Sequence, residues 1–289
     1  MPRVNRAIEL LEQGQPLYYT GAGELTYENG VEMAQTWADY LMVEMEHYAF
    51  NIPGLSAFMR GLIAGGPTRS GHRTPTVIAT LPTDGTSEEV MRANAWMVKH
   101  LLTAGVHGLL LCHAETPGAV RAYVESARFP FQSIGVGEGL GDGRRGSGGQ
   151  GTAAELWGLS VNEYLAKADP WPLNPEGELL LGLKIEDKRC LANAEANIEV
   201  PGVGFAEWGP GDMGMSLGYE DNHDPPYPDY MIAARNRVFA ACKSVGIAFL
   251  NGVNPDNVKE MLDEGVMIGS GGQEASEIGR RHTGRTMPW

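Results

Sequence analysis

The chain is poor in cysteine, with only three among 289 residues. Cys112, Cys190 and Cys242 are scattered and odd in number, so neither a disulfide framework nor the paired spacing of a zinc site is present. Such cysteines are typical of buried, reduced thiols. We therefore expect a cytoplasmic protein.

Long apolar runs and an excess of positive charge are also missing. No run approaches the ~20 apolar residues of a membrane span, and no signal-type apolar core follows the N-terminus. Lysine and arginine total 22 against 36 aspartates and glutamates, a formal net charge of -14. This balance argues against nucleic acid or an anionic membrane as partner. We expect a small-molecule substrate instead.

Strand-like apolar runs alternate with helical patterns along the whole chain. We expect strands at 17–20, 40–45, 76–80, 108–112, 179–185, 203–208, 247–250 and 266–268. Helices are expected at 29–38, 55–64, about 86–103, 117–127, 188–198, 230–245, 255–264 and 273–282. Eight such units of about 36 residues predict a (β/α)8 TIM barrel that spans residues 1–289 as one domain. A doubly wound sheet is the main alternative, although residues 21–23 do not complete a dinucleotide fingerprint.

Two of the apolar runs lead into carboxylates. The run at 179–185 precedes Glu186, and the run at 203–208 leads through a short turn to Asp212. The helical segment between them makes the strands parallel, so both carboxylates emerge at the same edge of the sheet. Converging carboxylates suit a divalent cation with open positions for substrate. The alternative is a pair of surface carboxylates that begin loops.

A histidine ends the second strand in the same way. The strand at 40–45 is followed by Glu46 and His47. A histidine beside acidic residues at a strand end is placed to act as a general base near neutral pH. Capping of the next helix is the alternative role.

Residues 135–151 form an insertion too rich in glycine to be helix or strand. It contains Arg144 and Arg145. It is either a disordered surface loop or a lid that touches the substrate. Its place before the fifth strand leads us to expect it near the catalytic face of the barrel.

Several strings in one order resemble the HpcH/HpaI family, the class II, metal-dependent pyruvate aldolases of the phosphoenolpyruvate/pyruvate-binding barrel group. They are GQPL at 14–17, EMEHYAFN at 44–51, AGVHGLLL at 104–111, ARFP at 127–130, KIE at 184–186 and GPGDM at 209–213. The second resembles the family's D-x-E-H-G-P-F-D, the fifth its Q-I-E and the last its G-P-A-D-L. The likeness extends over nearly the whole chain.

The resemblance implies roles for individual residues. Glu186 and Asp212 match the two carboxylates that bind the divalent metal ion, which would be Mg, Mn or Co. His47 matches the catalytic histidine, which works through a metal-bound water, and Glu44 matches the acidic residue that orients it.

The resemblance also implies how substrate and subunits are held. The backbone at Pro210 and Gly211 matches the part that holds the substrate carboxylate, and Arg145 matches the arginine of the family's G-x-R-G segment. It further implies a homo-oligomer, commonly a hexamer, whose last helix is exchanged between neighbours, and a place in the breakdown of aromatic compounds or sugar acids.

Two positions depart from the family pattern. Thr80 stands where the family has an arginine at the end of the third strand, and Lys184 stands where it has glutamine. Loss of the arginine removes a charge-assisted fork worth roughly 1.5–3 kcal/mol. Lys184 either supplies the missing positive charge, without the planar fork, or pairs only with Glu186 or Asp187.

Further polar and aromatic residues are expected at the catalytic face. His113 is the best of them, as a ligand or proton shuttle, and Trp208 is a candidate for an aromatic pocket that contacts substrate. The others are Tyr48, Glu115, Glu207, His223, Asp224 and Asn251.

Three functions follow. The leading one is a metal-dependent aldolase that cleaves a 4-hydroxy-2-oxo acid, or a related chelating substrate, to a pyruvate-type enolate and an aldehyde. The second is a divergent lyase or decarboxylase, or a lyase acting on acyl-CoA esters. The third is a binding protein without turnover, and retention of Glu186, Asp212 and His47 together speaks against it.

Overall fold

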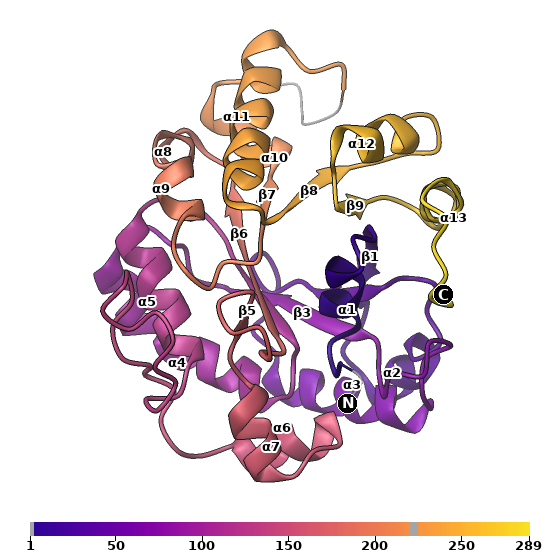
Figure 1. Ribbon diagram of the computed structural model, residues 1–289, viewed down its shortest axis with the longest axis vertical. Coiled ribbons are helices and arrows are strands. Elements are labelled where there is room, and N and C mark those ends of the chain that lie inside the picture. Colours follow the sequence, from indigo (N-terminus) through magenta and orange to yellow (C-terminus); the bar gives the residue numbers. More distant parts are fainter. Residues whose placement is uncertain (1–2, 220–224) are drawn as a thin grey trace.

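Parallel strands close into a ring in the computed structural model, which describes residues 3–219 and 225–289 (Figure 1). Around the ring, the order is β1-β2-β3-β4-β6-β7-β8-β9, and β9 pairs with β1. The eight strands are β1 (Leu17–Gly21), β2 (Tyr40–Val43), β3 (Thr76–Thr80), β4 (Gly108–Leu111), β6 (Leu179–Ile185), β7 (Phe205–Trp208), β8 (Ala248–Gly252) and β9 (Ile268–Ser270). The predicted (β/α)8 barrel is therefore confirmed. A two-residue strand, β5 (Pro170–Trp171), pairs with the start of β6 outside the ring.

Helices surround the ring and connect its strands (Figure 1). They are α1 (Arg6–Glu12), α2 (Tyr27–Met33), α3 (Ile52–Ala64), α4 (Glu88–Thr103), α5 (Pro117–Ala127), α6 (Gln150–Trp157), α7 (Val161–Lys167), α8 (Lys188–Ala192), α9 (Ala194–Ile198), α10 (Pro210–Ser216), α11 (Asp229–Val245), α12 (Val258–Glu264) and α13 (Gln273–His282). In the part of the chain that the structure describes, no helix combines the length and apolar character needed to span a bilayer.

The sequence patterns place the strands well and the short helices poorly. The helix expected at 188–198 is two helices, α8 and α9, that meet at Asn193, whose side chain donates to the backbone oxygen of Glu115 at 2.8 Å. The helix expected at 29–38 begins earlier, because the Thr26 hydroxyl caps it, and ends at Met33. The patterns gave no sign of α1, α6, α7 or α10, each only seven or eight residues long.

Strand β2 stops two residues earlier than expected. The backbone N–H of Met45 donates to the Thr80 hydroxyl at 2.7 Å, and that of Glu46 donates to a Glu44 carboxylate oxygen at 2.6 Å. Side chains thus take the hydrogen bonds that a neighbouring strand would provide. The chain consequently leaves the sheet at Val43 and begins the loop that carries Glu46 and His47.

Side chains alternate between the barrel interior and the outer layer. On β6, Leu179, Leu181, Leu183 and Ile185 pack in the large cluster beneath the helices. Leu180 belongs to a second cluster inside the ring, together with Phe205, Ile78 and Leu110. Lys184 follows Leu180 at an even spacing, so its side chain enters the interior at the carboxyl end of the barrel.

The opposite end of the barrel is closed by the first helix. Asn5 caps α1 through bonds from Ala7 and Ile8, and its amide donates to the backbone oxygens of His107 and Glu178. The Thr76 hydroxyl donates to the Asn5 side-chain oxygen at 2.8 Å. One asparagine thus joins α1 to the starts of three strands.

A buried charge network lies at the same end. Asp39, which is fully buried, accepts hydrogen bonds from Arg280 and Arg285 and lies 3.1 Å from an Arg6 nitrogen. Burial alone raises the pKa of Asp39, but Arg285, Arg280 and Arg6 lower it below its ordinary value. Through Arg280, helix α13 packs on the barrel of its own chain, next to α12. Exchange of this helix between subunits stays a prediction.

Candidate active site and metal centre

A lysine at the carboxyl end of β6 bridges two carboxylates. Lys184 Nζ lies 2.5 Å from Glu46 Oε2 and 3.5 Å from Glu186 Oε2. Burial lowers the pKa of Lys184, but the surrounding acidic groups, Cys112, Glu186, Glu207 and Glu46, together raise it above its ordinary value. The ammonium is therefore a fixed positive charge inside the barrel, 138 residues away in sequence from its closest partner.

Glu186 is almost completely buried, with 1% of its surface exposed. Its Oε1 accepts a hydrogen bond from the backbone N–H of His113 at 2.8 Å. Burial raises the pKa of Glu186 to about 8, although Lys184 acts in the opposite direction. A carboxylate in this position lacks compensating positive charge, which a bound cation could provide.

Glu46 is held differently. Burial raises the pKa of its carboxyl group, but the charge and hydrogen bond of Lys184 outweigh burial and lower it below the ordinary value. One oxygen, Oε2, is bound to Lys184, whereas Oε1 is buried and has no hydrogen-bond partner among the described residues. Unpaired buried oxygens are uncommon and call for a specific cause.

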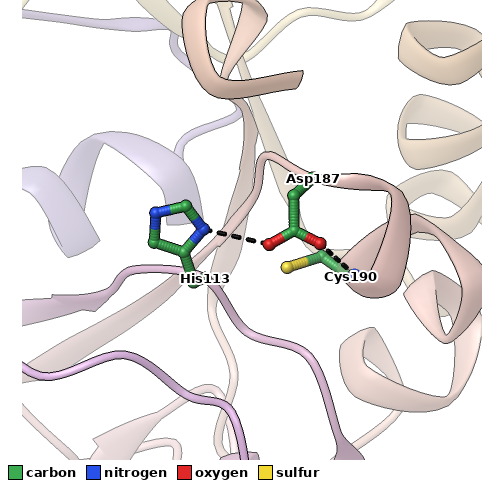
Figure 2. Close-up of side chains that lie close together, drawn as sticks. All are labelled: His113, Asp187 and Cys190. Atoms are coloured by element: carbon green, nitrogen blue, oxygen red, sulfur yellow. Dashed lines mark hydrogen bonds and ion pairs between the residues drawn. The ribbon is translucent and has the colours of Figure 1, made fainter. Parts of the chain in front are cut away.

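His113 lies between these carboxylates and Asp187. Its Nε2 is 3.6 Å from Glu46 Oε1 and 4.0 Å from Glu186 Oε1, while its Nδ1 bonds Asp187 Oδ2 at 3.0 Å (Figure 2). The hydrogen bond to Asp187 raises the pKa of His113 to about 9, and the charges of Glu186 and Glu46 add to the rise. In the described chain, His113 is the one non-glycine residue with positive φ, at 44°.

Asp187 is fixed from its other side by helix α8. Its Oδ1 accepts the backbone N–H groups of Arg189 and Cys190 at 2.6 and 2.9 Å, which makes it the N-cap of the helix. Burial raises its pKa, but the bonds from His113 and from these N–H groups lower it far below its ordinary value. Asp187 is therefore ionised and accepts from the imidazole. The Cys190 side chain lies beside the pair (Figure 2), and burial raises its pKa.

The structure places His47, Glu44 and Thr80 together. Glu44 binds the backbone N–H of His47 at 3.2 Å, so it fixes the loop. The His47 ring is 60% exposed and its Nε2 is 3.6 Å from Glu46 Oε2. The Thr80 hydroxyl donates to Glu44 and accepts from Met45 and Glu46, which uses its full hydrogen-bonding capacity. Thr80 thus shapes the loop and has nothing left for a substrate.

The second predicted metal ligand lies one strand further round the barrel. Asp212 is partly buried in the first turn of α10, which begins at Pro210 and Gly211. A Cβ atom on Gly209 would lie 2.7 Å from Glu186 Cβ, so only glycine lets this turn pack against Glu186. The turn and Glu186 are therefore in direct contact.

Among the described residues, two groups of three ligand-type side chains occur; one contains Glu186, and neither contains Asp212. One joins Glu46, His113 and Glu186, and the other joins His113, Asp187 and Cys190. Burial is the largest cause that raises the pKa of Glu207. Its acidic neighbours, Asp212 among them, add to the rise. Asp212 thus lies at the margin of the cluster in this conformation.

Trp208 and Arg145 are not brought into this cluster. Trp208 is buried, faces outward from β7 and lines a cavity of about 390 Å³ together with Tyr227, Arg235 and Asn251. Arg145 is buried over the Phe129 ring and bonds Tyr164. The loop at 135–149 follows α5, a helix that runs back to the amino-terminal end of the strands, so it lies away from Glu186. In the part of the chain that the structure describes, this loop does not form the expected lid over the site.

The sequence arguments gave no site role to Glu46 or Asp187. Glu46 carried a signal, because it precedes His47 in a string that resembles the family. Asp187 carried a weaker one, as an acidic residue directly before a helix. His223 and Asp224, also named as candidates, lie outside the described residues.

The residues present fit a divalent metal ion. The Oε1 of Glu46 is buried and unpartnered, and it lies within 4.8 Å of ligand atoms of Glu186 and His113. Oxygen and imidazole donors suit Mg, Mn, Fe or Co ions. Lys184 occupies the remaining carboxylate oxygens and leaves these atoms to the ion.

The fold is a TIM barrel of parallel strands. Buried carboxylates and two more exposed histidines lie at the carboxyl ends of these strands, and together they form a candidate metal and acid–base site. A sequence model of the family described as HpcH/HpaI aldolase/citrate lyase matches residues 74–278. The chain belongs to this family.

Individual relatives agree with this membership. The chain is 31% identical over 151 residues to 2-keto-3-deoxy-L-rhamnonate aldolase of Salmonella schwarzengrund (strain CVM19633), and the match covers 52% of this chain and 50% of that protein. It thus spans about half the length of the curated relatives it matches.

Solved structures share the fold. A HpcH/HpaI aldolase/citrate lyase family protein from Burkholderia cenocepacia J2315 aligns with a TM-score of 0.72 at 22% identity over 97% of both chains. The citrate lyase beta subunit from M. tuberculosis, solved with oxaloacetate and magnesium, aligns with a TM-score of 0.54 at 13% identity, over 93% of this chain and 96% of that chain.

Proposed function

We propose that this protein is a metal-dependent lyase that cleaves the carbon–carbon bond of a 4-hydroxy-2-oxo acid to give pyruvate and an aldehyde. The observation that carries the proposal is the pair of buried carboxylates, Glu46 and Glu186, that share a single lysine, with Oε1 of Glu46 left unpaired. Family membership and an aldolase relative support the reaction class. A magnesium complex of a neighbour in fold supports the cofactor.

The metal ion would be held by Glu186 with Asp212 and, when bound, would polarise the substrate's oxygens. His47 would accept the proton of the 4-hydroxyl group, because its exposed ring can reach an incoming substrate. As the bond between C3 and C4 breaks, the hydroxyl carbon becomes the aldehyde. The electron pair remains on the pyruvate fragment, and a proton returned to C3 completes the products.

Lys184 would supply positive charge to the fragment that carries the electron pair. The family's arginine is replaced by Thr80, whose hydrogen bonds are already used. Lys184 is positively charged, enters the barrel interior and is held by two carboxylates. A point charge without a planar fork favours substrates in which one oxygen, rather than a bidentate pair, needs stabilisation.

The test is pyruvate release by metal-stripped protein from a panel of 4-hydroxy-2-oxo acids, with Mg, Mn or Co restored. We expect metal-dependent release that falls at least 100-fold in Glu186→Gln and in His47→Ala. Glu195→Gln, an exposed carboxylate paired with Arg237, is the matched control and should keep full activity. Release that persists without metal would contradict the proposal.

A second candidate is a lyase that acts on a carboxylic-acid or acyl-CoA substrate of the citrate lyase type. The replacement of the family arginine by Thr80 favours it, and so does the structural neighbour complexed with magnesium, acetoacetate and coenzyme A. Adding citrate-like acids and their CoA esters to the same panel separates the two functions by the product formed.

We also propose a homo-oligomer, for which the family resemblance is the support. Phe131 and Ile134, which are 61% and 45% exposed, are apolar residues that a subunit contact could cover. Light scattering coupled to gel filtration would give the mass. A monomer of 31.2 kDa at micromolar concentration would contradict this part of the proposal.

A further inference from the structure

We infer that His113 is itself a ligand of the metal ion, held in place by Asp187, and that it adds an imidazole to the carboxylate ligands of the proposed site. This inference rests on the proposed metal site and names a ligand that neither the family match nor the relatives assign to this chain. It decides between the two roles, ligand or proton shuttle, that the sequence leaves open for His113.

Three donor atoms converge in the structure. Nε2 of His113 is 3.6 Å from Glu46 Oε1 and 4.0 Å from Glu186 Oε1. All three atoms lie within 4.8 Å of one another. Both carboxylates turn their other oxygen, Oε2, to Lys184. The lysine thus neutralises one side of each carboxylate, and the opposite side faces the imidazole.

Asp187 decides which ring nitrogen can bind a metal. Its Oδ1 accepts two backbone N–H groups of α8, and its Oδ2 bonds the Nδ1 atom of His113 at 3.0 Å (Figure 2). Nε2 is then the nitrogen left to face the two glutamates. Metal-bound histidines nearly always donate their other N–H to a carboxylate or carbonyl group in this way.

The backbone of His113 is also held for this position. A φ of 44° is rare for a residue with a side chain and costs free energy. It is maintained because the His113 backbone N–H donates to Glu186 Oε1 at 2.8 Å. Strain maintained by a contact to a metal ligand is typical of a functional position.

A nitrogen ligand changes the preferred ion. Imidazole binds Mn, Fe, Co and Zn ions well, whereas Mg prefers oxygen and water. We therefore expect the chain to bind Mn or Co more tightly than Mg, and to lose part of this preference when His113 is replaced.

The experiment is pulsed electron paramagnetic resonance of the full chain loaded with Mn(II). A coordinated imidazole gives modulation from its 14N nucleus, and labelling all histidines with 15N should shift that modulation to the 15N frequency. This measurement needs no variant. Stoichiometric Mn binding with no histidine modulation would overturn the inference and leave the proposed lyase intact, whereas no binding at all would overturn both.

Variants assign the signal to one histidine. His113→Asn, which tolerates the left-handed backbone, should abolish the modulation, and His47→Asn is the matched control that should retain it. Asp187→Asn keeps a helix-capping side chain and should weaken Mn binding about 10–100-fold while the modulation persists. Modulation lost in His47→Asn but kept in His113→Asn would overturn the inference.

Discussion

The two ends of the barrel each bury carboxylates, and they compensate the charge in opposite ways. At the amino-terminal end, Asp39 is surrounded by Arg6, Arg280 and Arg285, all at most 6% exposed. At the carboxyl end, Glu46 and Glu186 share one lysine. Three positive charges thus surround one carboxylate at the amino-terminal end, whereas two carboxylates share one positive charge at the carboxyl end.

The difference separates a structural network from a binding site. The excess guanidinium groups of the first end donate to backbone oxygens, such as Arg6 to Pro288 and Arg280 to Trp37. Asp39 is thereby paired within the chain, although the Nε atom of each of the three arginines has no hydrogen-bond partner among the described residues. The carboxyl end has an unpaired oxygen on Glu46, which a ligand can satisfy. The carboxyl end thus has an unpaired acceptor on Glu46, which a cation can satisfy, whereas the unpaired atoms of the three arginines are donors.

The largest expected effect comes from breaking the network of Asp39 and its three arginines. Asp39→Asn removes the one carboxylate that faces three buried arginines, and it should lower the free energy of unfolding by about 3–5 kcal/mol. Urea denaturation measures the change. A loss below about 1 kcal/mol would mean that the arginines are compensated without Asp39.

Lowering the pH should remove the same contribution of Asp39 to the free energy of unfolding. The pKa of Asp39 is lower in the folded chain than in the unfolded chain, so its stabilising contribution is present above the unfolded value and is lost as pH falls through the folded value. The unfolding free energy of the wild type should therefore fall below about pH 4. The Asp39→Asn variant should lack this component in the same titration.

Adding a divalent cation should supply positive charge to the carboxylates at the carboxyl end of the barrel. At a concentration of 100 times its Kd, Mn or Mg should stabilise the wild type by about 2.7 kcal/mol, because the ion binds the folded state. Thermal unfolding with and without EDTA measures the gain. Glu186→Gln should show none, and the Asp39→Asn variant should retain it if the two ends are independent.

Removing the lysine should have a smaller effect on the metal-free chain. Lys184→Met should cost about 1–3 kcal/mol, because Glu186, whose pKa is raised to about 8, can take up a proton in its place. The same variant should bind Mn more tightly, since the ammonium no longer competes for the carboxylates, while kcat falls. Isothermal titration calorimetry gives the affinity, and weaker binding would contradict the bridging role.

The smallest effect is expected at an exposed ion pair. Glu195 and Arg237 are 49% and 42% exposed and lie 2.8 Å apart. Glu195→Gln should change the free energy of unfolding by at most about 1 kcal/mol. A larger loss in the urea titration would show that the exposed Glu195–Arg237 pair contributes to stability as the buried Asp39 network does.

The sequence predicts the barrel because its strands are buried on both faces and appear as continuous apolar runs. It predicts Glu186 at the carboxyl edge because parallel strands end together. It could not predict that Lys184 pairs with Glu46, since that contact depends on the radius of the closed ring. The prediction that Arg145 lies near the catalytic face is wrong. The loop that carries it follows α5, and that helix returns the chain to the amino-terminal end of the strands.

The cap of α1 has a consequence for synthesis on the ribosome. Asn5 emerges among the first residues, but its partner Glu178 lies 173 residues later in the chain. At 5–20 residues per second, roughly 10–35 s pass before that partner is made. Helix α1 must wait for most of this time without its final contacts, so a chaperone that binds nascent chains would meet this segment exposed.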